Sequence, residues 1–415
     1  MGDLQQQLAL LKRRIARIDR KYAEGPPAPP PDPRRPERYF VEEWLGGTEV
    51  ETPLGKHYEV ERVWQRHRRH GSMDISTLAE LPSDLLDAIS GGAIAGSPPD
   101  RWVFLDTETT GLSGGTGTYA FLVGVGRITP EGFRLKQFFM RDYGEEASLL
   151  AALAAHLDDF DVLVTYNGKT FDQPLLETRY RMARARPPFG RMQHLDLLAG
   201  ARRLWKLRLE SCRLVDLENQ ILGVERQGDL PGEMIPYVYF EYLRTQEIER
   251  LAPVFHHNAI DILTLACLTG IVPWAFRSPG DAPLRHGADF VGLSRWLRQN
   301  EHHEEAAALF RRAIDLGLAD NLLFRTMWDL ALIEKRLGHD SAALAVFTDL
   351  AASPNPFRVA AFEELAKYYE HAERNYGMAL EFTRAALQIG ETPALKKREA
   401  RLARRAGGER SGRLL

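Results

Sequence analysis

Apolar runs between residues 101 and 276 predict a sheet covered by helices. The strand-like runs are RWVFLD, TYAFLVGVGRI, FRLKQFFM and DVLVTYN, and EEASLLAALAAHL has a helical pattern between the third and the fourth. The first three runs leave no room for a crossover helix, so they must pair as an antiparallel meander. The helix and the fourth strand then add a neighbour. We therefore expect an α/β domain over residues 101–276, with a mixed sheet and helices packed against it.

From Ala288 onward the pattern is entirely helical, and we assign residues 285–405 to an all-α domain. Small residues recur in it, since Ala306, Ala343 and Ala379 are 37 and 36 residues apart. Further apolar residues accompany these alanines four or seven positions later: Phe310, Phe347, Ala313, Leu350 and Ala386. This pattern of small residues at helix crossings, with a period of about 34 residues, resembles degenerate tetratricopeptide repeats. Simple helical hairpins packed on the α/β domain are the alternative.

The first 100 residues contain no evident chemistry. Residues 4–22 carry an apolar stripe at helical spacing among lysines and arginines, which predicts an amphipathic helix docked on its own chain or in a short coiled coil. A nucleic-acid-binding arm is the alternative for this helix. The proline-dense stretch that follows predicts a stiff linker, so residues 1–37 form one unit. Residues 38–100 then read as a hairpin that turns at 53–55 and a short helix.

Composition and charge limit the setting of the protein. With 415 residues the chain is too long for one ordinary domain. Its formal net charge of −3 is close to zero, so a nucleic-acid partner would need local basic patches. The two cysteines, Cys212 and Cys267, form no CxxC motif, which indicates a reducing compartment. Because the sequence has no signal-peptide pattern and no run of about 18 apolar residues, we expect a cytoplasmic protein without membrane contact.

Four acids stand beside elements of the predicted core. Asp106 and Glu108 end the first strand in FLDTETTGL, and side chains at i and i+2 of a strand point to the same face. Asp172 follows the fourth strand in VTYNGKTFD, and Asp261 lies in the helical pattern VFHHNAIDILTL. Gathered together, four carboxylates would repel and raise one another's pKa unless cations neutralised them. Hard divalent ions suit oxygen ligands, and a pair of them cleaves phosphodiesters, so we predict a site for two Mg²⁺ or Mn²⁺ ions.

These motifs resemble those of DEDD exonucleases, which belong to the ribonuclease-H-like superfamily. The resemblance rests on DxETTG, YNGKTFD and the aspartate after histidine, in this order along the chain. The stretches GGTGTYAFLVGVG, HLDLLAGARRLW and VFHHNAIDILTL also resemble the bacterial YprB-like group, which joins this nuclease domain to tetratricopeptide repeats. The resemblance covers about residues 38–270 well, the helical tail loosely and the first 37 residues poorly. It implies that Asp106, Glu108, Asp172 and Asp261 are catalytic residues and metal ligands.

The acid–base residue is open between two histidines. His256 has the His-x4-Asp spacing of one DEDD subgroup, and His257 takes the place of tyrosine in the Tyr-x3-Asp spacing of the other. On a continuous helix, residues i and i+4 share a face, which puts His257 beside Asp261 and turns His256 away. If the helix begins only at Asn258, a loop-borne His256 reaches the site equally well. We favour His257 as the catalytic group that orients or deprotonates the water, with His256 as the alternative.

The segment after the first strand is a candidate for substrate binding. TTGL resembles the family segment that contacts the terminal nucleotide, which implies roles for Thr109, Gly111 and Leu112, with Leu112 against the end bases. A glycine-containing turn that closes the strand is the plainer interpretation.

The segment after the fourth strand is a second candidate. Tyr166 and Asn167 are predicted to face the substrate, and Lys169 to meet a phosphate. A solvated loop position suits Lys169 equally well. Asp196 in HLDLL is a fifth acid near the site or a helix cap, and it stays outside the predicted metal set.

The sequence therefore predicts a metal-dependent nuclease, a 3′–5′ exonuclease that hydrolyses single-stranded DNA or RNA. We expect a nucleic acid with a single-stranded end as partner and, through the helical repeats, a protein partner. A structure-selective endonuclease on the same scaffold is one alternative. A non-catalytic nucleic-acid-binding adaptor that works through the repeats is the other, although it has no need of four mutually repelling carboxylates.

Overall fold

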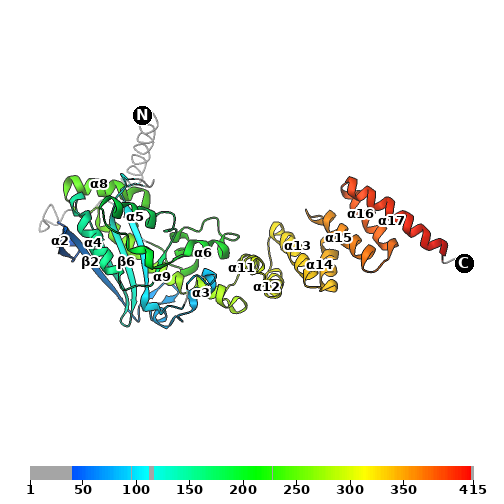
Figure 1. Ribbon diagram of the computed structural model, residues 1–415, viewed down its shortest axis with the longest axis horizontal. Coiled ribbons are helices and arrows are strands. Elements are labelled where there is room, and N and C mark those ends of the chain that lie inside the picture. The colour runs from blue at the N-terminus through cyan, green and yellow to red at the C-terminus, as the bar shows by residue number, and fades with distance from the viewer. Residues whose placement is uncertain (1–39, 95, 112–115, 227, 413–415) are drawn as a thin grey trace, which may run out of the picture.

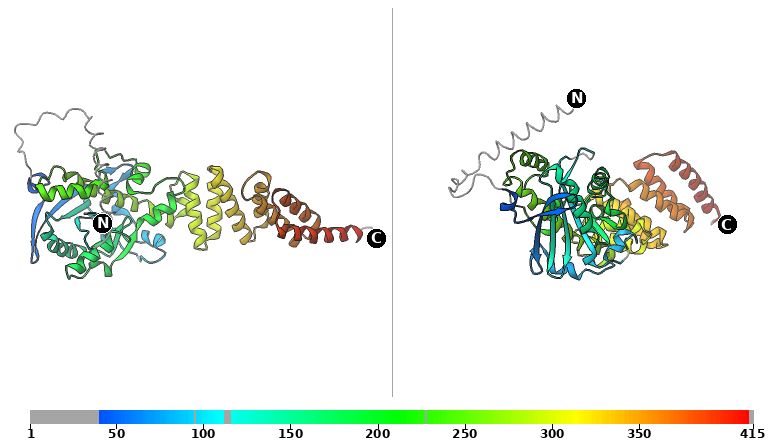
Figure 2. Two further views of the ribbon diagram at one scale, coloured as in Figure 1. Left: turned by 90° about the horizontal axis from the view of Figure 1, so that it is seen from above. Right: turned by 60° about the vertical axis from the view of Figure 1, so that its left-hand side comes forward.

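The protein has two parts, an α/β part and a row of helices that extends away from it (Figure 1 and Figure 2). The computed structural model describes residues 40–94, 96–111, 116–226 and 228–412. The predicted helix over residues 4–22 and the proline-rich linker lie outside the described residues.

A seven-stranded sheet in the order β1-β2-β7-β6-β5-β8-β9 forms the centre of the α/β part. The strands β5, β6 and β7 pair antiparallel, whereas β8 pairs parallel with β5, and β9 parallel with β8. The predicted meander and mixed sheet are therefore confirmed. The strands are β1 (Thr48–Thr52), β2 (Gly55–Gln65), β5 (Trp102–Thr109), β6 (Ala120–Thr129), β7 (Gly132–Phe139), β8 (Val162–Thr165) and β9 (Gln193–Asp196), and a separate two-stranded sheet consists of β3 (Arg69–His70) and β4 (Met73–Asp74).

The first described strands belong to the same sheet as the meander. β1 and β2 form a hairpin that turns between Thr52 and Gly55. β2 then pairs antiparallel with β7 over eight residues, from Tyr58 opposite Phe139 to Gln65 opposite Gly132. The sheet thus continues across the sequence boundary at residue 100, because β7 has a free edge that β2 covers.

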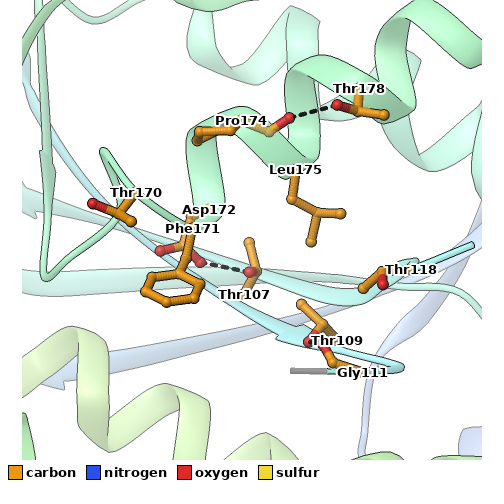
Figure 3. A pocket seen from close by; sticks show the side chains of 10 residues that line it. All are labelled: Thr107, Thr109, Gly111, Thr118, Thr170, Phe171, Asp172, Pro174, Leu175 and Thr178. Atoms are coloured by element: carbon orange, nitrogen blue, oxygen red, sulfur yellow. Dashed lines mark hydrogen bonds between the residues drawn. The ribbon is translucent and has the colours of Figure 1, made fainter. Parts of the chain in front are cut away.

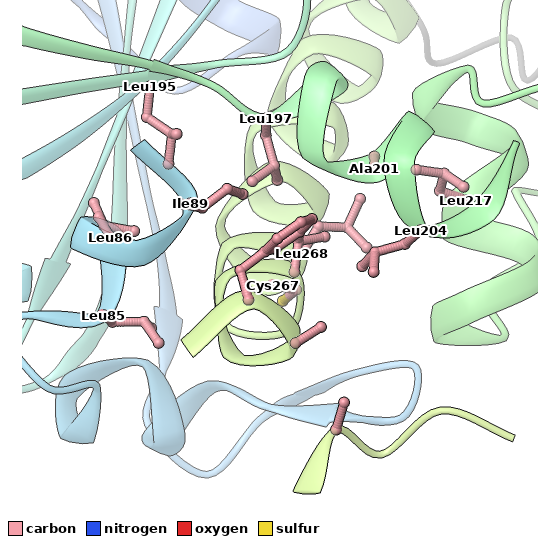
Figure 4. Close-up of a cluster of buried hydrophobic side chains, with 14 of the residues drawn as sticks. Leu85, Leu86, Ile89, Leu195, Leu197, Ala201, Leu204, Leu217, Cys267 and Leu268 are labelled. Atoms are coloured by element: carbon pink, nitrogen blue, oxygen red, sulfur yellow. The ribbon is translucent and has the colours of Figure 1, made fainter. Parts of the chain in front are cut away.

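The two faces of the sheet pack into two cores. On one face, Trp102 and Phe104 of β5 join a core with α3 (Leu85–Ser90), α6 (Leu197–Trp205) and α9 (Ala252–Thr269). Figure 4 shows the side chains of these three helices together. On the other face, Val103 and Leu105 join a core with α4 (Glu146–Leu157), α5 (Asp172–Met182) and α8 (Ile235–Thr245). Alternation along β5 thus sends successive side chains to opposite cores.

Two glycines let α9 approach the sheet closely. A Cβ at Gly124 of β6 would lie 2.2 Å from Asn258 Oδ1, and one at Gly126 would lie 2.6 Å from Ile262 Cγ2. Only glycine leaves room for the helix at these positions. Because these glycines have no side chain, α9 can place its polar residues over the end of β5.

The helix α9 is a core helix, although its composition alone permits another interpretation. The stretch Ala252–Arg277, which also includes α10 (Val272–Arg277), is long and apolar enough to cross a membrane, because an 18-residue window in it has a mean hydropathy of 1.8. The expectation that no such run exists was therefore wrong. In the fold, 78% of this window is buried, as expected for the central helix of a packed core.

The C-terminal region is entirely helical, as predicted. The three recurring alanines, Ala306, Ala343 and Ala379, are buried in α12, α14 and α16. The region joins the α/β part tightly, since a Cβ at Gly292 would lie 1.9 Å from the carbonyl oxygen of Arg203 in α6. Its helices are α11 (Gly287–Gln299), α12 (His303–Asp315), α13 (Asp320–Arg336), α14 (Asp340–Ala352), α15 (Arg358–His371), α16 (Tyr376–Ile389) and α17 (Pro393–Gly412), and the short elements before it are α2 (Val41–Trp44), α7 (Leu214–Leu217) and a π-helical turn (Glu218–Leu222).

Candidate active site

The end of β5 presents acidic and hydroxyl side chains to opposite faces of the sheet. Asp106 lies under α9, where Asn258 Nδ2 donates a hydrogen bond of 2.9 Å to its Oδ2. The next residue, Thr107, turns to the other face and donates from Oγ1 to Asp172 Oδ1 at 2.5 Å (Figure 3). Glu108 shares the face of Asp106 and is 8% exposed.

Asp172 reaches the same edge because β5 and β8 are parallel. Parallel strands end at one edge of a sheet, and the loop after β8 leads from Thr165 to the start of α5 at Asp172. The carboxyl edge of an open α/β sheet is where such folds bind ligands. Asp172 is buried, with 8% of its surface exposed.

Burial raises the pKa of all four acids, and the charges of the others add to this for the two on β5. Burial, followed by the charges of Asp261 and Asp172, raises the pKa of Asp106 well above its usual range. Burial and the charges of Asp106, Asp261 and Asp172 do the same for Glu108. Burial also raises the pKa of Asp172, to about 6, against the hydrogen bond from Thr107. The predicted acids therefore gather at one site and repel one another as expected.

Both predicted histidines lie inside α9, which begins at Ala252. His257 lies beside Asp261, with 3.6 Å between Nε2 and Oδ2, as the helical spacing requires. His256 is exposed and lines a surface cavity with Trp44 and Arg62. The helix thus brings His257, and not His256, next to the fourth acid.

An arginine and two further acids adjoin Asp261 and were missed from the sequence. Arg226 donates from Nη2 to Asp261 Oδ1 and from Nη1 to Asp229 Oδ2, the latter at 3.1 Å. Its Nε also donates to Glu218, which is fully buried. These residues come from a loop and a π-helical turn, whose approach to α9 has no local sequence signal. Asn258 was also missed, although its i, i+3 spacing to Asp261 indicates a shared helix face.

The donor chemistry of the acids fits hard divalent cations. All four offer carboxylate oxygens, and among the described residues nothing donates a hydrogen bond to the side chain of Glu108. In the described part of the chain, however, no three His, Cys, Asp or Glu side chains are arranged as they stand to hold a metal ion. Asp261 faces Arg226 and Asp172 faces Thr107. Metal binding would therefore require these two acids to exchange their protein partners.

A cavity of about 370 Å³ opens beside Asp172 (Figure 3). The predicted substrate residues Thr109 and Gly111 line it, whereas Leu112 lies outside the described residues. Phe171 also lines this cavity, and 53% of its surface is exposed. An exposed aromatic ring beside a cavity is a surface on which a base can stack.

The loop after β8 is held by Asp196 at the end of β9. Asp196 caps α6 at Leu198 N and also accepts from the backbone N–H groups of Asn167, at 2.8 Å, and Lys169, at 3.2 Å. Asn167 has φ 67°, a left-handed backbone conformation in which asparagine is common. This conformation alone explains an asparagine at this position. Asp196 is therefore a cap that positions this loop.

A second cavity, of about 600 Å³, lies beyond this loop. Tyr166 and Asn167 line it together with Arg202 and Lys206 of the α6 segment, whose side chains are exposed. The Tyr166 hydroxyl donates to the Cys212 carbonyl oxygen, so its ring is fixed at the cavity wall. Lys169 is exposed on the same loop and does not line the cavity.

Comparison with known proteins first defines the class. Residues 103–272 match the model of the RNase_H superfamily, so this part of the chain is an RNase H-like domain, of a superfamily of generally hydrolytic nucleases. In an alignment over 382 residues, the chain is 34% identical to the uncharacterized protein YprB of Bacillus subtilis (strain 168), and the match covers 88% of this chain and 87% of that protein. The chain belongs to the YprB family.

A solved structure resembles part of the chain only weakly. It is the family B DNA polymerase from the hyperthermophilic archaeon Pyrobaculum calidifontis, with a TM-score of 0.33 and 15% identity. The match covers 49% of this chain and 30% of the polymerase. A likeness at this level supports no inference about function.

Proposed function

We propose that the protein is a metal-dependent 3′–5′ exonuclease that acts on single-stranded DNA or RNA. The observation that carries the proposal is the gathering of Asp106, Glu108, Asp172 and Asp261 at the carboxyl edge of the sheet, with the pKa of each raised first by burial. Repelling carboxylates destabilise a fold, so their presence together is explained by cations that bind there. The RNase H-like domain that contains them supports hydrolysis of nucleic acid as the reaction.

The four carboxylates would hold two Mg²⁺ or Mn²⁺ ions, which would supply an activated water and stabilise the leaving oxygen. His257 is the proposed acid–base residue, because its Nε2 lies 3.6 Å from Asp261 Oδ2 and so faces the acids. A histidine in this position can orient the attacking water and accept its proton.

The substrate path follows from the two cavities. In the cavity beside Asp172, the ring of Phe171 would stack on the terminal base while Thr109 and Gly111 contact the nucleotide. In the cavity beyond β8, Arg202 and Lys206 would neutralise phosphates upstream of the cleaved bond. Lys169 stands on the exposed loop that separates the two. Stacking and phosphate contacts carry little sequence information, which suits an enzyme without sequence preference.

The test is digestion of end-labelled oligonucleotides in the presence of Mn²⁺. The wild-type protein is expected to release labelled mononucleotide from a 3′-labelled single strand, and Asp106→Asn and Asp172→Asn to release none. Asp315→Asn is the matched control, since Asp315 is an exposed acid on α12. Full activity of Asp106→Asn or Asp172→Asn would show that the assignment of the carboxylates is wrong.

Two further measurements separate the proposal from its alternatives. Circular single strands resist an exonuclease and are cut by an endonuclease, so cleavage of circles would replace the first activity with the second. Titration of the protein with Mn²⁺ in a calorimeter tests the adaptor alternative. Absence of binding would favour an adaptor, because only a nuclease of the proposed kind depends on the ion.

A further inference from the structure

Four side chains beside the proposed metal site form a closed ring of polar contacts. Arg226 contacts Asp261 and Asp229, and His257 contacts the same two aspartates from α9. Two members come from the loop after the π-helical turn and two from α9. The ring therefore ties a loop to the helix that carries the fourth acid.

The ring is anchored on a carboxylate that solvent does not reach. Glu218 is 0% exposed and accepts from Arg226 Nε at 3.1 and 3.0 Å and from Thr264 Oγ1 at 2.9 Å. The hydroxyl of Thr264 lies 2.8 Å from His70 Nε2, in the small sheet of β3 and β4. Only 7% of the Arg226 side chain is exposed. Because each of its three nitrogens donates to a carboxylate, the guanidinium has little freedom to turn.

The contact with Asp229 selects the hydrogen position on His257. His257 Nδ1 lies 2.9 and 3.0 Å from the two carboxylate oxygens of Asp229. An ionised carboxylate can only accept, so Nδ1 must carry the hydrogen and Nε2 is the nitrogen left for chemistry. Although burial raises the pKa of Asp229, the hydrogen bonds and charges of His257 and Arg226 lower it overall, so Asp229 stays ionised.

We propose that Asp229 is a positioning residue of the hydrolytic site, which holds His257 by Nδ1 so that Nε2 faces Asp261, and that Arg226 keeps Asp229 and Asp261 in one frame. The proposal rests on the proposed function, because it assigns to His257 the handling of the attacking water. Neither residue touches the substrate in this scheme. Both act through His257 and Asp261, as partners that orient catalytic side chains do in other sites.

The first experiment is a double-mutant cycle on the full chain. Asp229→Ala is expected to lower kcat for a single-stranded oligonucleotide by roughly 10–100-fold with KM unchanged, the range for loss of an orienting partner. In a His257→Gln background the same substitution is expected to lower kcat no further, because its target is gone. Glu225→Ala, at a neighbouring exposed acid, is the control with wild-type kcat. Equal losses in both backgrounds would overturn the proposal, since they would show that Asp229 acts by another route.

The second experiment needs no activity. In metal-free protein labelled with ¹⁵N-histidine, the His257 signals, identified by their loss in His257→Gln, are expected to report a hydrogen on Nδ1. Asp229→Ala is expected to shift them toward the mixture of tautomers of a free imidazole, and unchanged signals would overturn the proposal. Should Asp229→Ala fail to fold, Arg226→Lys takes its place, because lysine lacks the planar fork of donors that holds Asp229 beside Asp261.

The outcomes distinguish the two proposals. Loss of activity in Asp106→Asn together with wild-type kcat in Asp229→Ala would remove only the role of Asp229. Full activity in Asp106→Asn would remove the proposed function itself, whatever the histidine signals show.

Discussion

Both parts of the molecule bury carboxylates, but among the described residues only those of the helical part all pair with an arginine. Glu370 of α15 is 2% exposed and accepts from Arg398 at 2.9 Å and from Arg401 at 3.0 and 2.8 Å. Although burial raises its pKa, the hydrogen bond from Arg401 and the charges of both arginines lower it overall. Asp329 is likewise buried beside Arg298, at 2.8 Å. Both acids therefore have arginines of the chain itself as partners.

In the part of the chain that the structure describes, the acids at and beside the end of β5 have no arginine partners, in contrast to those of the helical part. Among the described residues, no basic side chain forms an ion pair with Asp106, Glu108 or Asp172. The pKa of each is raised, with burial the largest cause. Asp261 stands between the two cases, because Arg226 pairs with it. Since the chain can neutralise buried acids and does so in its helical part, the missing counter-charges at β5 support the proposal that cations from solution complete that site.

The largest expected effect separates the two kinds of acid by activity. Glu108→Gln is expected to lower the rate of metal-dependent digestion by roughly 10³-fold, because losing a ligand of the proposed metal site would remove about 4 kcal/mol of transition-state stabilisation. Glu370→Gln is expected to leave kcat/KM unchanged. Digestion of a 3′-labelled strand measures both. Similar losses in the two variants would contradict this distinction, since they would show that any buried acid matters equally.

The next largest expected effect is on stability, and it concerns the buried acid of the helical part. Glu370→Gln is expected to destabilise the helical region by about 2–3 kcal/mol, since the charged acceptor that Arg398 and Arg401 share is lost. The measurement is urea denaturation followed by circular dichroism. As its control, Glu381→Gln changes an exposed acid on α16. An unchanged denaturation midpoint for Glu370→Gln would mean that the arginines are satisfied by water.

Removal of a charge beside the end of β5 should instead stabilise the protein. Asp172→Asn is expected to stabilise the metal-free protein by about 1–2 kcal/mol at pH 7.5, because the pKa of Asp172 is raised to about 6. A folded pKa above the unfolded value of about 3.9 means that the native state binds more protons between these values, so wild-type stability falls as pH rises through this window. The advantage of Asp172→Asn should therefore vanish as pH drops from about 6 to about 4. Thermal melting at several pH values measures it, and a variant less stable than wild type at pH 7.5 would contradict it.

The positions of several acids of this site could be predicted from the sequence, because they depend on the local periodicity of strands and helices. Strand alternation places Asp106 and Glu108 on one face, and helical spacing places His257 beside Asp261. Three antiparallel strands without crossovers allow only one kind of pairing. The catalytic and substrate-binding roles of these residues stay predictions.

What could not be predicted depends on contacts between distant segments. The pairing of β2 with β7 follows from a free sheet edge, which no local pattern encodes. Arg226 and Asp229 reach α9 from an irregular loop, and the buried Glu218 that anchors them has the sequence pattern of an ordinary helix surface. The sequence also contains no sign that Phe171 stays exposed, since apolar residues before a helix are usually covered.

The smallest expected effect concerns apolar side chains that are exposed to solvent. Phe171 at the site and Ile389 of α16 are similarly exposed, at 53% and 47%. Phe171 lies at a cavity beside an acid of the proposed metal site, so Phe171→Ala is expected to raise KM for single strands about 5-fold, which corresponds to about 1 kcal/mol of lost stacking. Ile389→Ala, the matched control, should leave KM unchanged. Because stacking binds the ground state and the transition state alike, kcat should stay near wild type. A fall in kcat without a change in KM would instead place Phe171 among the residues that position Asp172, its neighbour at the start of α5.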